Sequence, residues 1–282
     1  MDPATTFARG LKTALIGQVR AVFNDRSRGE APVQRQPETS LFGPESVVWR
    51  VHGDVTTMMV GGVSALLLQM LHPAVLAGVW DHSRFRDDMH GRLRRTARFI
   101  AVTSYGSAEE AEAVIAKVRE VHGFVQGVLP DGTAYRADDP RLLAWVHVSE
   151  AVSFLDAWIR YAEPRMSTAD QDRYFAEFAL IADKLGADPV PRSRAEAEAL
   201  IAAMRPELRV DARTRDVARV VLGQPAPRPS MMPLKALTFQ AAIDLLPGWA
   251  RRMHGLRAAG LATPAVRIGT QSVARTLRWA FR

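Results

Sequence analysis

The chain has 282 residues, with 37 lysines and arginines against 30 aspartates and glutamates, so its formal net charge is +7. Hydrophobic residues make up 48%, enough to fill a sizeable core, which excludes intrinsic disorder for most of the chain. The absence of cysteine excludes disulfides, zinc ribbons, iron–sulfur clusters, cysteine nucleophiles and thiolate-bound cofactors. Any metal must therefore be held by His, Asp, Glu or Tyr.

The excess positive charge lies at the C-terminal end. Residues 250–282 contain seven arginines and no acidic residue, which leaves residues 1–249 neutral and argues against nucleic-acid binding. The same segment carries an apolar stripe formed by Val266, Val273, Leu277 and Phe281. A basic amphipathic helix of this kind suits peripheral contact with an anionic membrane or a docking partner. The alternative is a helix that packs on the body and leaves its arginines in solvent.

Nothing in the sequence indicates export or membrane insertion. The N-terminus lacks a basic segment followed by a clean apolar run. The longest apolar stretch, Met58 to Leu71, is too short and too polar to span a bilayer. We therefore expect a cytoplasmic protein, with the basic tail as its one candidate for membrane contact.

Helical periodicity runs through almost the whole chain, and strand alternation is nearly absent. After an amphipathic stretch up to Phe23 and a polar linker, the pattern and the capping residues predict helices near 44–71, 91–104, 107–129, 138–161, 168–186, 194–204, 211–222, 233–246 and 248–259. His72-Pro73 ends the first of these, and a loop is expected around Asp81-His82-Ser83. The prediction is an all-α fold, divided into an N-terminal segment (1–41), a helical domain (42–245) and basic C-terminal helices (246–282).

Two histidines lie on strongly apolar helix faces. His122 shares its face with residues such as Ile115 and Val125, and His147 shares its face with Phe154 and Trp158. A neutral imidazole in an apolar pocket is what haem iron requires. The alternative for each is a core histidine that donates to a backbone carbonyl.

An arginine-rich segment precedes these histidines. Arg92 and Thr96 are four residues apart and so share one helix face, and Arg119 lies one turn before His122. An arginine beside haem can pair with a propionate, and an arginine or threonine can donate to bound oxygen. The alternative is a solvated basic face.

A third group combines imidazole with carboxylate, a mixture that suits iron or manganese. Its members are Asp81, His82, Asp87, Asp88 and His90. Capping or hydrogen bonding is the simpler role for Asp81 and Ser83, because these residues lie in a loop without regular spacing. HExxH, a glycine-rich phosphate loop and GxSxG are all absent, and Gly61-Gly62 is best explained by close helix packing.

The order of these residues resembles one family. The elements of the resemblance are Gly61-Gly62, Leu68-Gln69-Met70-Leu71-His72-Pro73, Gly78-Val79-Trp80-Asp81-His82-Ser83, Arg92-Leu93-Arg94-Arg95-Thr96, Tyr105-Gly106, Val121-His122-Gly123, Tyr135-Arg136-Ala137-Asp138-Asp139-Pro140 and Trp145-Val146-His147. Over residues 42–245 the chain is similar to the catalytic domain of bacterial rubber oxygenases (latex clearing proteins) and fungal MpaB-type oxygenases. Each piece is short, but the ordered set is specific.

The resemblance implies a globin-like helical core with peripheral helices, holding haem b. His122 matches the proximal iron ligand, Arg92 and Thr96 match the arginine and threonine near the haem, and Arg119 matches the arginine before the ligand. Arg95 stands where the rubber oxygenases have a distal lysine; it keeps the charge but cannot act as a base. Gln126 replaces another arginine, so the distal site of this chain differs from that of the rubber-cleaving enzymes.

We therefore expect a haem b oxygenase that uses dioxygen on a small apolar substrate such as an alkene. Arg95 and Thr96 are the expected catalytic residues, and Arg92, Thr96, Arg119 and His122 the haem-binding ones. The alternatives are a haem-binding or gas-sensing protein without turnover, and a haem-free protein of the same fold that uses the Asp81–His90 loop for a metal or for nothing. His147 is the rival iron ligand.

Overall fold

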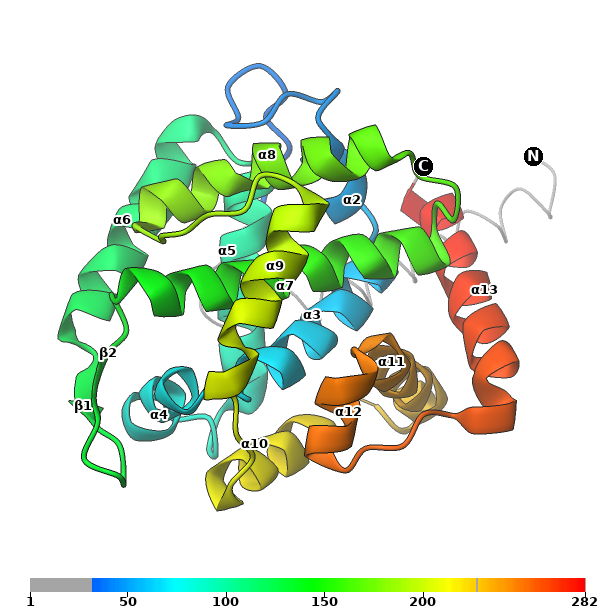
Figure 1. Ribbon diagram of the computed structural model, residues 1–282. Helices are drawn as coiled ribbons and strands as arrows, with labels where there is room; N and C mark the ends of the chain where they lie inside the picture. Colours follow the sequence, from blue (N-terminus) through cyan, green and yellow to red (C-terminus); the bar gives the residue numbers. More distant parts are fainter. Residues whose placement is uncertain (1–31, 227, 282) are drawn as a thin grey trace, which may run out of the picture.

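The computed structural model describes residues 32–226 and 228–281 and confirms the all-α fold (Figure 1). The amphipathic N-terminal stretch predicted up to Phe23 lies outside the described residues. The α-helices are α2 (Val47–His52), α3 (Val55–Gln69), α4 (Pro73–His82), α5 (Met89–Tyr105), α6 (Ala108–Phe124), α7 (Pro140–Tyr161), α8 (Thr168–Leu185), α9 (Arg194–Met204), α10 (Ala212–Leu222), α11 (Met232–Leu245), α12 (Gly248–His254) and α13 (Thr263–Phe281). Two short strands, β1 (Gln126–Val128) and β2 (Ala134–Arg136), form an antiparallel hairpin.

The N-terminal half contains two more helices than predicted. The helix expected over 44–71 is broken at Gly53, and Asp54 starts α3 by accepting a hydrogen bond from the Thr57 amide at 2.9 Å. His72-Pro73 ends α3 as expected, but Pro73 also begins α4, because proline is well suited to the first turn of a helix. The loop expected at residues 81–83 is therefore the end of a helix that the prediction missed.

The hairpin is the second difference from the prediction. The helix expected to reach residue 129 ends at Phe124, and the chain continues as β1, with Gln126 paired to Arg136 of β2. The predicted turn at residues 130–132 is present, and Gly132 has the positive φ of 88° that glycine adopts without strain.

Helices α3 and α7 form the centre of the molecule (Figure 1). They approach closely at Gly61, where a Cβ atom would lie 2.8 Å from the Ser153 carbonyl oxygen and 2.9 Å from the Phe154 ring. This explains Gly61 by close helix packing, as predicted. Side chains of α7 such as Trp145 and Leu155 are fully buried, and α8 and α9 cover the other side of this helix.

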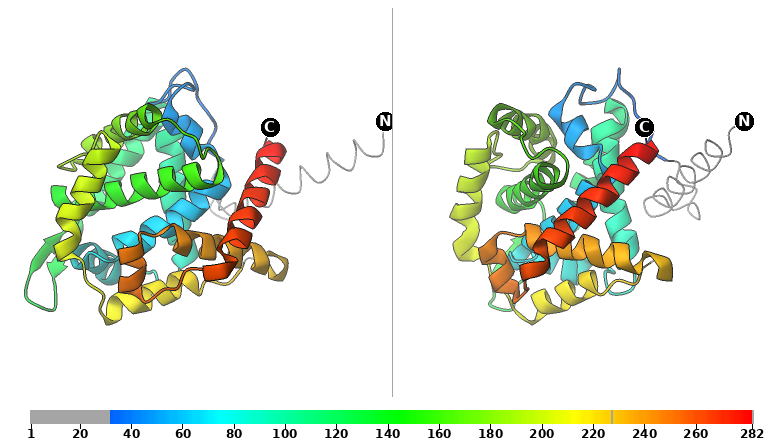
Figure 2. Two further views of the ribbon diagram at one scale, coloured as in Figure 1. Left: turned by 45° about the vertical axis from the view of Figure 1, so that its right-hand side comes forward. Right: turned by 90° about the vertical axis from the view of Figure 1, so that its right-hand side faces the viewer.

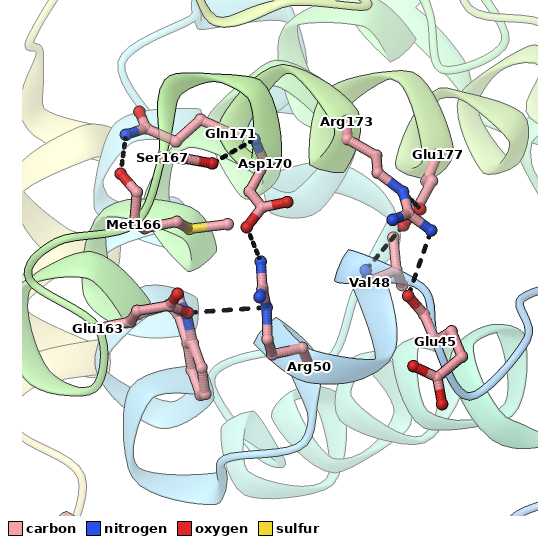
Figure 3. Close-up of polar contacts among 11 residues, drawn as sticks. Glu45, Val48, Arg50, Glu163, Met166, Ser167, Asp170, Gln171, Arg173 and Glu177 are labelled. Carbon is pink, nitrogen blue, oxygen red and sulfur yellow. Dashed lines mark hydrogen bonds and ion pairs between the residues drawn. The ribbon is translucent and has the colours of Figure 1, made fainter.

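A cluster of polar contacts joins α2 to α8 (Figure 3). Arg50 forms ion pairs with Asp170 at 2.7 Å and with Glu163 at 3.6 Å. The carboxylate of Glu177 accepts from the Val48 amide at 3.0 Å and from Arg173 at 2.7 Å. These contacts hold the short helix α2 against the body, although six residues would form only a marginal helix alone.

The basic tail forms α13, which runs obliquely across one side of the molecule (Figure 2). Thr270 and Ala274 are buried against the body, and Arg278 forms an ion pair with the buried carboxylate of Asp54 at 2.6 Å. Of the two predicted arrangements, the described part of α13 therefore takes the one packed on the body. Its outer face still exposes Ile268 and Trp279.

Among the described residues, one helix is long and apolar enough to pass a membrane-span test, namely α7, and the bent pair of α3 and α4 passes it together. About two thirds of the apolar window of α7 (67%) is buried inside the protein, as expected of a central core helix. The test is therefore weak evidence for a membrane span.

Candidate active site

Helices α5 and α6 bring the predicted site residues to one place. Only Gly106 and Ser107 separate the two helices, which pack against each other as a helical hairpin. Ser107 begins α6 with a capping box, in which its hydroxyl accepts from the Glu110 amide and the Glu110 carboxylate accepts from the Ser107 amide. The chain reversal places Arg92, near the start of α5, beside His122, in the last turn of α6.

His122 is half-buried, and no hydrogen bond joins its imidazole to another described residue. Burial lowers the pKa of His122, the nearby carboxylate of Asp138 opposes this shift, and the positive charge of Arg92 adds to it. The net direction is downward, so the ring is neutral at pH 7. A neutral imidazole with a free nitrogen can bind a metal ion.

Asp138 reaches His122 through the hairpin. The Ala137 amide donates to the Val125 carbonyl at 2.9 Å, which fixes the segment after β2 beside the end of α6. Asp138 is itself held by two hydrogen bonds from Arg136, at 2.9 and 2.7 Å. A carboxylate beside a ligating imidazole typically orients the ring. From the sequence, Asp138 is predicted only to start a helix, although it lies in one of the motifs that carry the resemblance.

Arg92 lies within electrostatic range of His122 and also lines an apolar cavity. The cavity has a volume of about 40 Å³ and lies between α3, α4, α5 and α10, with Arg92 as the one charged residue in its lining. The other lining residues are Leu66, Gln69, Met70, Val75, Leu76, Val79, Met89, Val217 and Val221. Burial lowers the pKa of Arg92, and the neighbouring Arg95 adds to the shift, but an arginine keeps its charge in proteins.

The other three predicted residues are less enclosed. Thr96 is half-buried one turn beyond Arg92, and its hydroxyl donates to the Arg92 carbonyl at 3.3 Å. Arg95 is exposed and forms an ion pair with Asp88 at 3.4 Å. Arg119 is exposed on α6. The structure therefore brings Arg92 within electrostatic range of His122 and places Thr96 one turn farther along α5, with Arg95 and Arg119 exposed.

His147 lies in a different environment, between α7 and α8. Burial lowers its pKa to about 4, and the imidazole packs against the Phe178 ring with 4.9 Å between the ring centroids. Its Nε2 atom has no hydrogen-bond partner among the described residues. Its neighbours thus belong to the core rather than to the group around His122.

The segment around Asp81 and His82, for which metal binding was the alternative to hydrogen bonding, contacts the hairpin. Asp81 accepts from the Tyr135 hydroxyl at 2.8 Å, and Nε2 of His82 lies 3.0 Å from the Gln126 carbonyl oxygen. Within residues 32–226 and 228–281, no group of three or more His, Asp or Glu side chains is arranged to hold a metal ion. The hydrogen-bonding role is therefore the one that the structure shows for Asp81 and His82.

The surface beside His122 is unusually apolar. Val121 is 46% exposed, Phe124 is 77% exposed, and Val128 on the adjacent strand is 62% exposed. Large apolar side chains that are exposed within one short stretch of chain favour a binding face. Gln126, which replaces an arginine of the rubber oxygenases, is exposed between them.

Comparison with known proteins identifies the family of the chain. The family model for the ER-bound oxygenase mpaB/B'/rubber oxygenase catalytic domain matches residues 49–279. The match includes α5, α6 and the hairpin, and continues through most of α13. Neither the curated proteins nor the solved structures contain a match. Because the family model spans most of its length, the chain belongs to the mpaB/rubber oxygenase catalytic-domain family.

Proposed function

We propose that this oxygenase-family protein binds haem b, with His122 as the proximal iron ligand. The observation that carries the proposal is the environment of His122, whose imidazole is neutral and has no hydrogen-bond partner among the described residues. The Asp138 carboxylate lies within electrostatic range of the ring, where its negative charge makes the imidazole more basic and so a stronger ligand. One free imidazole and an apolar surface are the donor set that b-type haem requires.

Arg92 is positioned to hold a haem propionate. Its charge lies within electrostatic range of His122 and is largely removed from water, which favours pairing with a carboxylate. Arg119, one turn before His122 and exposed, is the second candidate for this role. We assign Thr96 and Arg95 to the side of the site where oxygen and substrate react. Arg95 must leave Asp88 to reach that side.

The substrate that fits is small and apolar, such as an alkene. Haem supplies the dioxygen chemistry in oxygenases, while the protein supplies orientation and exclusion of water. The cavity beside Arg92 is lined almost entirely by aliphatic side chains and has room for roughly three water-sized groups. The cavity can therefore bind the end of an apolar substrate. A charged substrate would have only Arg92 as a counter-charge in the lining.

The test is the absorption spectrum of protein expressed with added haem precursor. Wild-type protein should show a Soret band, and His122→Ala should lose it because the iron has no other ligand at that position. Free imidazole added to the variant should restore the band by occupying the vacated ligand position. A Soret band that is unchanged in His122→Ala would contradict the assignment.

His147→Gln is the matched control, because His147 is the rival ligand and glutamine keeps a polar side chain there. This variant should keep the Soret band, and its circular dichroism should confirm that the helices are intact. Loss of the band in His147→Gln, with the band retained in His122→Ala, would move the ligand to α7.

A further inference from the structure

A second cleft lies where α7 ends, between α11, α12 and the start of α13. Its volume is about 410 Å³, within the range of about 300–1,000 Å³ typical of small-molecule sites. Arg160 and Tyr161 line it from α7, Asp244 from α11, Arg251 from α12 and Arg267 from α13. None of these residues belongs to the site around His122.

The cleft has a net positive charge that the protein does not neutralise. Among the described residues, none of its three arginines forms an ion pair with a carboxylate. Arg160 donates to the Asp244 carbonyl oxygen at 2.8 Å, and Arg251 makes a longer contact of 3.5 Å to the same oxygen. These contacts hold the two guanidinium groups beside the cleft and leave most of their N–H donors free. Three arginines and one aspartate give the cleft a charge of +2.

Only one of the two carboxylate oxygens of the cleft aspartate accepts hydrogen bonds from described residues. Asp244 is 8% exposed, and its Oδ1 atom accepts from the Gln240 side chain at 3.0 Å and from the Ala259 amide at 2.9 Å. Its Oδ2 atom has no partner among the described residues. A buried carboxylate oxygen without a donor is costly, so a ligand that supplies a hydroxyl group would be favoured here.

The first turn of α13 adds to the attraction for anions. Thr263 begins this helix of 19 residues and lines the cleft. The free amide groups and the dipole of a helix favour negative charge at its N-terminus. The Thr263 amide donates to the Gly260 carbonyl and Pro264 has no N–H, so the helix contributes its dipole and the arginines supply the N–H donors.

We propose that this cleft binds a phosphate monoester that also carries a hydroxyl group. A phosphate monoester has nearly two negative charges at pH 7 and so balances the +2 of the cleft, whereas a carboxylate would leave half of that charge. Its oxygens pair with the arginine forks, and its hydroxyl donates to Asp244 Oδ2. The same glycerol phosphate chemistry occurs in free metabolites and in the headgroups of anionic lipids, and charge balance favours the free monoester over a lipid diester.

The test is calorimetric titration of the full chain with glycerol 3-phosphate. Binding is expected for the wild type, and Arg267→Gln should weaken it by about tenfold because one charge-assisted contact is lost. Arg275→Gln is the matched control, since Arg275 is exposed on the same helix but outside the cleft. Both variants change a surface residue and should melt at the wild-type temperature. No binding by the wild type, or equal binding by both variants, would overturn the proposal.

A second comparison tests the hydroxyl contact. Wild-type protein should bind glycerol 3-phosphate more tightly than propyl phosphate, which lacks the hydroxyls. Asp244→Asn should reduce this preference, because the amide nitrogen can only donate a weaker, neutral hydrogen bond to the hydroxyl oxygen. Equal affinity of the wild type for both compounds would disprove the role of Asp244. Vesicles of phosphatidylglycerol, with phosphatidylcholine as control, identify the source of the phosphate. Binding to the anionic vesicles without binding to glycerol 3-phosphate would show that the cleft takes a lipid.

Discussion

Glu150 on α7 is a half-buried carboxyl group whose environment leads to a prediction at the residue scale. Burial raises its pKa from 4.5 to about 7, although the hydrogen bond from Gln69 acts in the opposite direction. A raised pKa in the folded state means that folding favours the protonated form. Stability is therefore full below about pH 4.5, falls as the pH rises to about 7, and is constant above that value.

Replacing Glu150 by Gln should remove this loss. Glutamine keeps an oxygen that accepts from Gln69 and carries no charge, so Glu150→Gln should raise the free energy of unfolding at about pH 8 by up to about 3 kcal/mol. The gain should disappear near pH 4.5. Urea unfolding at several pH values measures this gain in the free energy of unfolding. Glu120→Gln is the control, because Glu120 is an exposed glutamate in an ion pair with Lys117. A gain that does not depend on pH would mean that charge burial is not its cause.

At the scale of elements, the crossing of α3 and α7 depends on one glycine. A Cβ atom at Gly61 would lie 2.8 Å from the Ser153 carbonyl oxygen, a backbone atom that cannot move without displacing α7. Gly61→Ala should therefore lower the free energy of unfolding by about 1–3 kcal/mol, as other overpacked cores do. Thermal and urea unfolding measure the loss.

The adjacent glycine is a natural control for this prediction. A Cβ atom at Gly62 would meet only the Phe154 ring, at an ordinary contact distance of 3.8 Å. Gly62→Ala should be neutral or stabilise the helix by up to about 1 kcal/mol, because alanine has the higher helix propensity. Equal effects of the two substitutions would show that helix packing does not depend on Gly61.

At the scale of the whole molecule, two buried histidines make a large contribution to the response to acid. Burial lowers the pKa of His52 to about 3 and that of His147 to about 4, from 6.5 in each case. In mildly acidic solution both imidazoles therefore stay neutral in the folded protein and become protonated only when the protein unfolds. Their contribution to stability is complete above pH 6.5 and is lost as the pH falls from 6.5 towards the folded pKa values.

Protonation of Glu150 adds stability between about pH 7 and 4.5 and offsets part of this loss. Two histidines outweigh one carboxyl group, so the wild-type protein should show a net loss of stability below pH 6.5 in equilibrium unfolding experiments. His147→Phe should make the loss shallower, because Nε2 of His147 has no partner to give up among the described residues. His52 is less suitable for substitution, since it interacts with Ser104 at 2.8 Å and Tyr174 at 3.0 Å. An acid response that is unchanged in His147→Phe would assign the loss to other groups.

Much of the fold could be predicted from local signals. Helix α9 begins and ends where its pattern predicts, and α8 ends at Gly186 in the left-handed conformation expected of a helix C-cap. These boundaries depend on residues within one turn of each other. The pairing of Arg92 with Thr96 on one face is predictable for the same reason.

Other features depend on contacts between distant segments. The hairpin was missed because three-residue strands carry too little alternation to detect. Asp138 reaches His122 only through that hairpin, so its place near the imidazole could not be predicted from spacing. The break at Gly53–Asp54 was missed because the apolar pattern continues across it.

Composition and periodicity alone are sufficient for the all-α class and the absence of cysteine chemistry, because helix faces repeat over a few residues. They leave His122 and His147 as equal candidates, and the choice of His122 and Arg92 comes from the family resemblance. Tertiary structure was needed to bring Arg92 beside His122, to pack the basic tail on the body and to gather three arginines around Asp244. Those arrangements depend on which helices pack together, and packing joins residues that are far apart along the chain. The positive charge seen first in the sequence is thus in part the lining of a cleft, which its position near the C-terminus did not indicate.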